Sequence, residues 1–272
     1  MKVGVIGAGY VGLTMACLAD FNNEVLFVGR SQEKIDGLKK GAIPVYEPGL
    51  GEIFVRCLKS NRIDATTDYN RLKCTEIIFL CVGTPSRENG SIDLSQIEAA
   101  SKEIGKQLHD GSYKTVVVKS TVIPRTTKDV VLPILERESG KKAGRDFGVA
   151  MNPEFLREGT GIYDFLNPDK IVIGGIDSRS VETVAKLYEF YDQKIPRIYT
   201  DLNTAEMIKY ANNSALAVRI SFINEIANIC EKVSVDVSQV AKAIGLDTRI
   251  GPRFLNAGIG FGGSCFPKDV KA

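Results

Sequence analysis

The sequence has few residues suited to hold a zinc ion. Its 272 residues include one histidine, His109, and six cysteines at positions 17, 57, 74, 81, 230 and 265, none of them spaced as C-x-x-C. Zinc sites need closely spaced Cys and His ligands, so we expect no metal site. Most of the cysteines lie in apolar contexts, such as Cys81 in IIFLCVG. A cysteine there is usually a small buried hydrophobe.

Long apolar runs and a strong net charge are also lacking. No apolar run reaches the ~18 residues of a membrane-spanning helix. The N-terminal MKVGVIGAGYVG lacks the basic start and small-residue cleavage site of a signal peptide. The net charge of +2, from 35 basic and 33 acidic side chains, gives no reason to expect nucleic acid or an anionic membrane as a partner. We therefore expect a cytoplasmic protein that begins with a β-strand.

Apolar runs alternate with helical patterns over the first two hundred residues. Strands are expected at 2–7, 24–29, 76–83, 114–120, 147–151 and 170–175, and helices at 10–20, 31–40, 95–108, 125–138 and 180–191. Several strands are nearly continuous in apolar residues, as parallel strands covered on both faces are. The alternation predicts an α/β fold of the Rossmann type, with a doubly wound, mostly parallel sheet.

After Thr200 the pattern changes. Residues 203–233 contain no Gly or Pro, and apolar residues recur at spacings of three and four, which predicts one helix far longer than the ~11-residue mean. So much apolar helix surface must be covered, and we expect a homodimer through it. A short helix at 236–244 and a Gly-rich loop to the chain end follow. We assign a dinucleotide-binding domain to 1–200, and the long helix with a small helical segment to 201–272.

A G-x-G-x-x-G pattern, GAGYVG at 7–12, lies directly after the first strand and opens a helix. The glycines permit a tight turn, close approach of a pyrophosphate, and close helix–strand packing. The helix N-terminus then faces the anion. The pattern predicts dinucleotide binding, and a glycine turn used only for packing is the alternative. The cofactor residues in it are Gly7, Gly9, Tyr10, Val11 and Gly12.

The second strand ends without the acidic residue that binds the adenosine ribose in NAD enzymes. The sequence there is Gly29-Arg30-Ser31. Without a carboxylate a 2′-phosphate meets no repulsion, and Arg30 could pair with it, so we expect NAD or NADP with a lean towards NADP. An Arg30 that only points to solvent, with NAD bound through its pyrophosphate, is the alternative.

Polar residues with a chemical role are expected on the long helix and in the loop after it. Lys209 and Asn213 are four residues apart and share a helix face. One interpretation is that the two side chains together stabilise an anion. The alternative is that the lysine side chain only extends to water and the amide has no role with it. Cys265 lies in a Gly loop beside Lys268 and Asp269, not in an apolar run. A cation and exposed backbone amides favour the thiolate, which is the nucleophilic form of cysteine.

The segment Asn152-Pro153-Glu154 is typical of a helix start. It offers an N-cap, a proline at the first helical position and an acid in the first turn. Glu154 and Glu158 would then lie four residues apart on one helix. Capping and complementarity to the helix dipole are sufficient to explain both acids without a catalytic role.

Eight sequence blocks span nearly the whole chain in a specific order. They are GAGYVG at 7–12, VYEPGL at 45–50, VGTP at 82–85, STVIP at 120–124, MNPEFLREGTGIYDFLNPDKIVIGG at 151–175, EMIKYANNSALAVRISFINEIA at 206–227, RIGPRFLNAG at 249–258 and GFGGSCFPKD at 260–269. In these blocks the sequence resembles the UDP-glucose/GDP-mannose dehydrogenase family. FGGSCFPKD and NPEFLREGTGIYDFLNPD look more like its UDP-glucose branch, so UDP-glucose is the expected substrate.

The resemblance implies a two-step oxidation. The family oxidises the C6 hydroxyl of a nucleotide sugar to an aldehyde, a cysteine thiolate adds, a second hydride transfer gives a thioester, and water releases the uronic acid. Cys265 matches the nucleophile, and Lys209 and Asn213 match the pair that stabilises the oxyanion. Asp269 matches an acid that orients a water or polarises Lys209. Glu154 matches the hydrolytic base.

The resemblance also implies which residues line the two binding sites. The family positions water and nicotinamide at the places of Thr121 and Glu158. A catalytic role is implied for Thr121. Arg249 matches an arginine that reaches a neighbouring subunit's site. Further cofactor contacts are implied for Gly29, Arg30, Lys34, Thr84 and Lys268. Substrate contacts are implied for Glu154, Phe155, Leu156, Arg157, Lys209, Asn213, Phe254, Leu255, Asn256, Ala257, Gly258 and Gly262.

Two departures from the family pattern leave alternatives open. The missing acid at Gly29 leaves the choice between NAD and NADP open. Family members also continue beyond the position of Ala272 into a second α/β domain, so we expect this chain to be a truncated or cleaved front part. Within the enzyme class, GDP-mannose and UDP-N-acetylmannosamine are the alternative substrates. A non-catalytic, dimeric cofactor-binding fragment is the alternative outside it.

Overall fold

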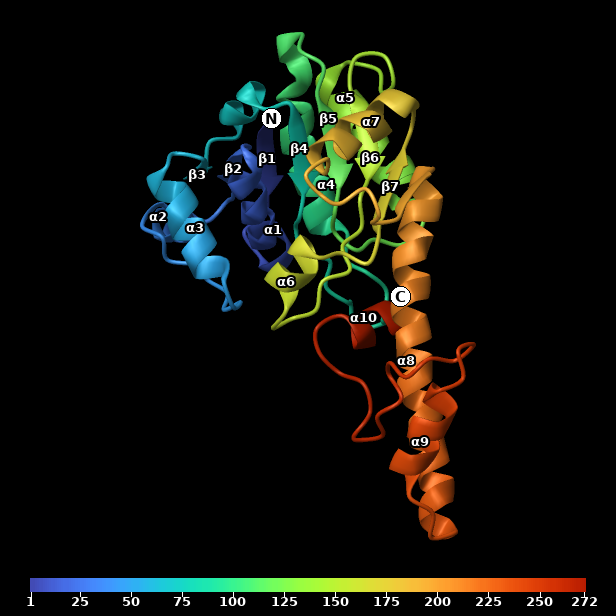
Figure 1. The fold of residues 1–272 in the computed structure, drawn as a ribbon. Coiled ribbons are helices and arrows are strands. Elements are labelled where there is room, and N and C mark those ends of the chain that lie inside the picture. The colour runs from blue at the N-terminus through green and yellow to red at the C-terminus, as the bar shows by residue number, and fades with distance from the viewer. The chain divides into compact units, whose positions relative to one another are not determined.

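The computed structural model describes residues 1–272, except for the side chain of Asp110, and the chain forms two compact units. Unit 1 comprises Met1–Thr84 and Asp93–Met207, and unit 2 comprises Pro85–Ile92 and Ile208–Ala272. The boundary falls within the long helix α8 (Leu202–Lys232), drawn in orange in Figure 1. Among the described residues, no helix is both long and apolar enough to cross a membrane.

Unit 1 is built on one eight-stranded sheet in the order β3-β2-β1-β4-β5-β6-β7-β8. Only β6 and β7 pair antiparallel, and all other neighbours are parallel. The predicted Rossmann-type, mostly parallel sheet is therefore confirmed. Its order reverses between β1 and β4. The strands are β1 (Lys2–Ile6), β2 (Glu24–Val28), β3 (Ile63–Thr66), β4 (Ile77–Leu80), β5 (Thr115–Val118), β6 (Gly148–Met151), β7 (Ile171–Gly175) and β8 (Arg197–Thr200).

Helices connect these strands, as the right-handed crossovers of a parallel sheet require. Strands β4, β5 and β6 are buried at every position, which explains their continuous apolar sequences. The helical elements are α1 (Tyr10–Thr14), the 3-10 helix η1 (Met15–Phe21), α2 (Gln32–Lys39), α3 (Leu50–Lys59), the 3-10 helices η2 (Tyr69–Cys74) and η3 (Leu108–Asp110), α4 (Ser95–Gly105), the π-helix η4 (Thr127–Val131), α5 (Leu132–Ser139), α6 (Gly161–Leu166) and α7 (Ser178–Leu187).

The predicted helix start at Asn152 is wrong. The chain after β6 is irregular, and the next helix, α6, begins only at Gly161. Asn152 does not act as an N-cap because its buried side chain is used elsewhere. Its Nδ2 donates to the carbonyl of Val172 at 2.7 Å, and its Oδ1 accepts from the Tyr188 hydroxyl at 2.7 Å. Glu154 and Glu158 therefore lie in a loop rather than on a shared helix face.

Two strands and two α-helices of unit 1 were not predicted from the sequence. Strand β3 reads IDAT, with a charge in a four-residue run, and β8 reads RIYT at the exposed edge of the sheet. Neither offers the apolar run or clean alternation that identifies a strand. The helices α3 and α6 begin near glycines, Gly49 and Gly161, which are more typical of turns.

Unit 2 contains most of α8, followed by α9 (Val237–Gly245) and α10 (Phe266–Lys271). The long helix predicted at 203–233 and the short helix at 236–244 are confirmed. The expectation of a loop to the chain end is wrong for the last residues, which form α10. Pro267 in the first turn of α10 has no N–H to leave unsatisfied, so it is compatible with a helix start.

Candidate functional site

The carboxyl ends of five strands meet at one edge of the unit 1 sheet. Because β1, β2, β4, β5 and β6 run parallel, the segments that follow them leave the sheet on the same side. These segments are 7–12, 29–31, 83–84, 119–121 and 152–158. Ligands of doubly wound sheets bind at this edge, near the point where the strand order reverses. The fold thus brings most of the predicted cofactor residues to one region.

The glycine loop after β1 has the geometry that a dinucleotide requires. Gly7 has a φ of +106°, and a Cβ there would lie 2.6 Å from the carbonyl oxygen of Cys81. A Cβ on Gly12 would lie 1.9 Å from the carbonyl oxygen of Gly7. By contrast, a Cβ on Gly9 would meet nothing within 4 Å. Packing therefore explains the outer glycines but not Gly9, which faces open space where a pyrophosphate would fit.

The segments after β4 and β5 are tied together. The Thr84 hydroxyl donates to the carbonyl of Thr121 at 2.9 Å, and Ser120 Oγ donates to the carbonyl of Val82 at 2.6 Å. Thr84, expected to contact the cofactor, and Thr121, expected near the water and nicotinamide, are therefore neighbours. After β2, Arg30 is exposed. Ser31 caps α2, because its Oγ accepts from the Lys34 amide at 3.3 Å.

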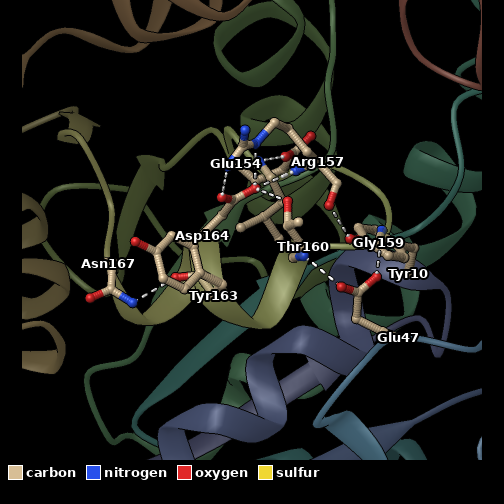
Figure 2. Close-up of polar contacts among 11 residues, drawn as sticks. Tyr10, Glu47, Glu154, Arg157, Gly159, Thr160, Tyr163, Asp164 and Asn167 are labelled. Atoms are coloured by element: carbon tan, nitrogen blue, oxygen red, sulfur yellow. Dashed lines mark hydrogen bonds and ion pairs between the residues drawn. The ribbon is translucent and has the colours of Figure 1, made fainter.

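The loop at residues 154–161, here called the acidic loop, follows β6 (Figure 2). Glu154 is buried, and its Oε2 accepts from the backbone amide of Leu156 at 2.6 Å. Phe155 lies beneath the ammonium of Lys170, 4.1 Å from the ring centroid.

Arg157, expected to contact substrate, is held within unit 1 by an acid of α6. Its Nη2 lies 2.6 Å from Asp164 Oδ1, and its Nε and backbone amide donate to Asp164 Oδ2 at 3.0 and 2.9 Å. Burial opposes ionisation of Asp164, but hydrogen bonds from Arg157 and Thr160 outweigh it and lower the pKa of this carboxyl. The guanidinium therefore has a fixed structural partner in this structure.

Sequence reasoning missed Glu47, which holds the acidic loop from the other side. Its buried carboxylate accepts from the amide of Gly161 at 2.6 Å and of Gly159 at 3.0 Å. Glu47 belongs to the sequence block VYEPGL, in which an acid before Pro-Gly suggests only a turn. The residues that Glu47 binds lie more than a hundred residues further along the chain, so the sequence did not identify its role.

In unit 2, Asp269 links α10 to α8. Asn213 Nδ2 donates to Asp269 Oδ2 at 2.7 Å, and Lys268 Nζ lies 2.5 Å from Asp269 Oδ1. Lys209 lies one turn before Asn213 on α8, and both side chains are buried. Cys265 is half-buried and is the N-cap of α10. One small region of this unit thus contains all four residues expected around C6, together with Lys268.

Residues 249–258, which include the expected substrate contacts Phe254 to Gly258, pack on α8 through two residues that the sequence did not single out. The Arg219 guanidinium donates to the carbonyls of Ile250, Gly251 and Arg253 at 2.7–2.9 Å. Asn224 Oδ1 accepts from the Gly258 amide at 2.9 Å. Both residues project from a long helix, where sequence alone does not distinguish a loop support from a solvated side chain.

The expected loop residues themselves differ in exposure. Leu255 is buried, Phe254 is half-buried with a φ of +62°, and Arg249 is exposed and paired with Asp247 at 2.6 Å. The exposed members are Asn256, Ala257, Gly258 and Gly262.

Most of the other cysteines are more deeply buried than Cys265. Cys17, Cys57, Cys81 and Cys230 are buried, while Cys74 is exposed. Burial is the main reason that the pKa of Cys81 rises to about 12, that of Cys17 to about 12 and that of Cys57 to about 11. These three thiols therefore remain protonated and unreactive at neutral pH.

Comparison with known proteins gives a consistent result. Residues 1–192 match the NAD binding domain of the UDP-glucose/GDP-mannose dehydrogenase family, and residues 203–272 match its central domain. The whole chain is 47% identical to a UDP-glucose 6-dehydrogenase of Haloferax volcanii, covering 64% of that protein. It is 44% identical to a GDP-mannose 6-dehydrogenase of Pseudomonas syringae pv. syringae, covering 63% of it.

Solved structures agree with the sequence matches. A UDP-glucose dehydrogenase from the hyperthermophilic archaeon Pyrobaculum islandicum superposes with a TM-score of 0.94 at 40% identity, over 99% of this chain and 62% of that one. The chain spans about three fifths of the length of the curated relatives it matches, from 58% to 64%.

Proposed function

The chain belongs to the UDP-glucose/GDP-mannose dehydrogenase family, and from that premise we propose that it carries the catalytic residues of a UDP-glucose 6-dehydrogenase. The reaction is the oxidation of the C6 hydroxyl of UDP-glucose to the carboxylate of UDP-glucuronate. The observation that carries this proposal lies in unit 2, where Asn213 of α8 donates to Asp269 of α10, the short helix whose N-cap is Cys265.

The proposed cofactor is NAD or NADP, held by the loop at 7–12. The open space at Gly9 supports this, as do the tied segments that contain Thr84 and Thr121. A nicotinamide bound there would accept one hydride from C6, so the two oxidations would use two cofactor molecules in turn. Glu158 and Lys268 are the further residues proposed to contact it.

Cys265 is the proposed nucleophile. After the first oxidation C6 is an aldehyde carbon, and the thiolate forms a bond to it while the carbonyl oxygen takes the electron pair. Asn213 donates one Nδ2 hydrogen to Asp269, and its second hydrogen is proposed to reach that oxyanion together with the Lys209 ammonium. Loss of a second hydride from C6 restores the carbonyl and leaves a thioester on Cys265.

Hydrolysis completes the proposed reaction. Glu154 takes a proton from a water that Thr121 or Asp269 helps to position, and the water oxygen bonds to C6. The bond between C6 and Sγ breaks, the uronate leaves and the thiolate of Cys265 is restored. Phe254 to Gly258, with Gly262, are proposed to form the loop that covers the sugar nucleotide, and Arg249 is proposed to reach a second subunit.

A homodimer through α8 is part of the proposal. Val218, Phe222, Ile229 and Val233 are between 49% and 65% exposed. Their spacings of four, seven and four residues place them on one stripe of the helix. An exposed apolar stripe of this length is typical of an interface. Two copies of the helix related by a two-fold axis would cover each other's apolar stripe.

A second substrate, GDP-mannose, is favoured by the 44% identity to a GDP-mannose 6-dehydrogenase. The test measures cofactor binding by titration and the formation of reduced nicotinamide with UDP-glucose, GDP-mannose and UDP-N-acetylmannosamine in parallel. We expect residues 1–272 to bind cofactor and to oxidise UDP-glucose slowly, since nucleotide contacts from the relatives' additional length contribute to positioning C6. Cofactor binding without oxidation of any of the three would support a non-catalytic binding module instead.

A further inference from the structure

We propose that Glu47 is a positioning residue that couples the cofactor loop at 7–12 to the acidic loop at 154–161. The proposal rests on the proposed function, because it concerns how Glu154 and Glu158 are held next to the dinucleotide site. All the residues that carry it belong to unit 1.

The Glu47 carboxylate is fixed on both sides. It is 4% exposed, and its Oε1 accepts from the Gly161 amide at 2.6 Å while its Oε2 accepts from the Gly159 amide at 3.0 Å. Figure 2 shows this carboxylate directed at the loop backbone. An ionised carboxylate that receives a backbone N–H at each oxygen makes strong, charge-assisted hydrogen bonds. A neutral amide in its place would offer one acceptor and turn a donor towards the other N–H.

Glu47 is itself held in place by the core. It precedes α3 across a Pro-Gly turn, and its carbonyl accepts from the Leu50 amide at 3.1 Å. Leu50 and Phe54 of α3 are buried in the hydrophobic core. The acidic loop is thereby attached to a rigid element rather than to another loop.

Tyr10 connects the same loop to the cofactor site. It is the residue after Gly9 and begins α1, and its hydroxyl donates to the carbonyl of Arg157 at 2.7 Å. Burial, followed by the proximity of the Glu47 carboxylate, raises the pKa of this phenol above its ordinary value. A Cβ on Gly161 would lie 2.1 Å from the Tyr10 hydroxyl oxygen, so only glycine permits this approach. Tyr10 is therefore shared by the two loops.

A functional consequence follows from this geometry. Anything that fixes the first turn of α1 also fixes Tyr10, and through Tyr10 and Glu47 it fixes the backbone at 157–161. A dinucleotide bound at 7–12 should therefore order the acidic loop, and by thermodynamic reciprocity an ordered acidic loop should favour dinucleotide binding. The acids Glu154 and Glu158 would then be held more firmly when the cofactor is bound.

The experiment compares Glu47→Gln with Glu52→Gln by hydrogen–deuterium exchange and NAD titration. Glu52 is an exposed acid in the first turn of α3, so its variant removes the same charge without touching the loop. In Glu47→Gln, we expect exchange across 157–162 to speed up by about tenfold in the cofactor-free protein. We expect NAD to slow exchange there in the wild type and in Glu52→Gln, but much less in Glu47→Gln. The NAD dissociation constant of Glu47→Gln should rise about threefold to tenfold.

Each outcome decides the proposal. Exchange at 157–162 that is equal in the two variants would overturn the role of Glu47, with the proposed function intact. Equal protection by NAD in Glu47→Gln and wild type would overturn the coupling. A wild type that binds no dinucleotide would overturn the proposed function and the coupling together, while cofactor-free exchange would still report whether Glu47 holds the loop. If Glu47→Gln does not fold, Tyr10→Phe removes only the bond to Arg157 and should give a smaller loss of protection in the same direction.

Discussion

Asn213 Nδ2 donates to Asp269 Oδ2 at 2.7 Å, across 56 residues of sequence. This bond fixes the orientation of the Asn213 amide, because it uses one hydrogen and leaves the other directed elsewhere. It also ties α10, and with it the N-cap residue Cys265, to the face of α8 that contains Lys209. Cys265 thereby belongs to a helix that is bonded to the α8 face on which the proposed oxyanion-stabilising pair, Lys209 and Asn213, lies.

The first prediction concerns Cys265. We expect Cys265→Ser to abolish the second oxidation, because a serine hydroxyl is a far weaker nucleophile than a thiolate. Uronate formation should fall by several orders of magnitude in any form of the enzyme that turns over UDP-glucose. The measurement is uronate produced per enzyme.

Cys81→Ser is the matched control. Cys81 is buried behind the glycine loop, and burial raises its thiol pKa to about 12. We expect this variant to lose stability, because a hydroxyl enters an apolar site at a cost of about 1–3 kcal/mol, and to keep uronate formation per folded molecule. Normal uronate formation by Cys265→Ser would show that the nucleophile was assigned wrongly.

The second prediction is that α8 forms a dimer interface. Phe222→Glu places a charge in the middle of the exposed apolar stripe, so it should shift the protein to monomer by sedimentation at micromolar concentration. Phe222→Leu keeps an apolar side chain at the same position and should remain dimeric. A wild type that sediments as a monomer throughout the high micromolar range would refute the interface.

The third prediction concerns Glu206, at the start of α8. Its buried carboxylate accepts from the Arg125 amide at 2.6 Å, the Thr127 amide at 2.7 Å and the Thr127 hydroxyl at 2.6 Å. Burial raises the pKa of Glu206, and the hydrogen bonds from Thr127 and Arg125 only partly oppose it. The folded protein therefore binds this proton more tightly than the unfolded chain does.

The sign of the pH dependence follows from that raised pKa. The stabilising contribution of the bound proton is complete below the unfolded value of about 4.3 and is lost as pH rises through the folded pKa. The free energy of unfolding of the wild type minus that of Glu206→Gln should therefore decrease as pH rises from about 4 towards neutrality. The measurement is urea unfolding of both proteins across this range. A difference that stays constant, or increases, would contradict the assignment.

The sequence predicts the parts of this molecule that depend on local patterns. Continuous apolar strands and the G-x-G-x-x-G turn identify the sheet and its ligand edge, and the absence of Gly and Pro identifies α8. Asn152 shows where local reasoning fails. Its Asn-Pro-Glu context is typical of a helix start, but Val172 of β7 and Tyr188, which follows α7, use its amide instead. Tertiary hydrogen bonds override local propensity at such buried polar positions.

The same limit explains why Glu47 and Arg219 were missed. Each acts on backbone groups of a loop distant in sequence: Gly159 and Gly161 for Glu47, and residues 250–253 for Arg219. A backbone partner leaves no side-chain pattern in the sequence. The predicted site residues, by contrast, come from the family resemblance, which marks reacting side chains, and their roles stay predictions.

The last prediction concerns the choice between NAD and NADP at the end of β2. Gly29 stands where a carboxylate would accept hydrogen bonds from the adenosine ribose. The missing carboxylate weakens NAD binding by roughly 1.5–3 kcal/mol. For NADP, exposed Arg30 offers a charge to the 2′-phosphate, although an exposed ion pair contributes under about 1 kcal/mol. Ser31 Oγ accepts from the Lys34 amide, so its own hydrogen is available to donate to the phosphate. We therefore expect a modest preference for NADP, or use of both cofactors.

Gly29→Asp tests this expectation directly. A Cβ on Gly29 would lie 3.4 Å from the Ile35 side chain, an ordinary contact, so the variant should fold without strain. The new carboxylate should strengthen NAD binding through the ribose hydroxyls and weaken NADP binding by repelling the phosphate, reversing the preference. Titration of both cofactors into wild type, Gly29→Asp and Arg30→Ala measures it, and Arg30→Ala should weaken NADP alone. A wild type that binds NAD much more tightly than NADP, with neither affinity changed by Gly29→Asp, would mean that contacts away from β2 determine the choice.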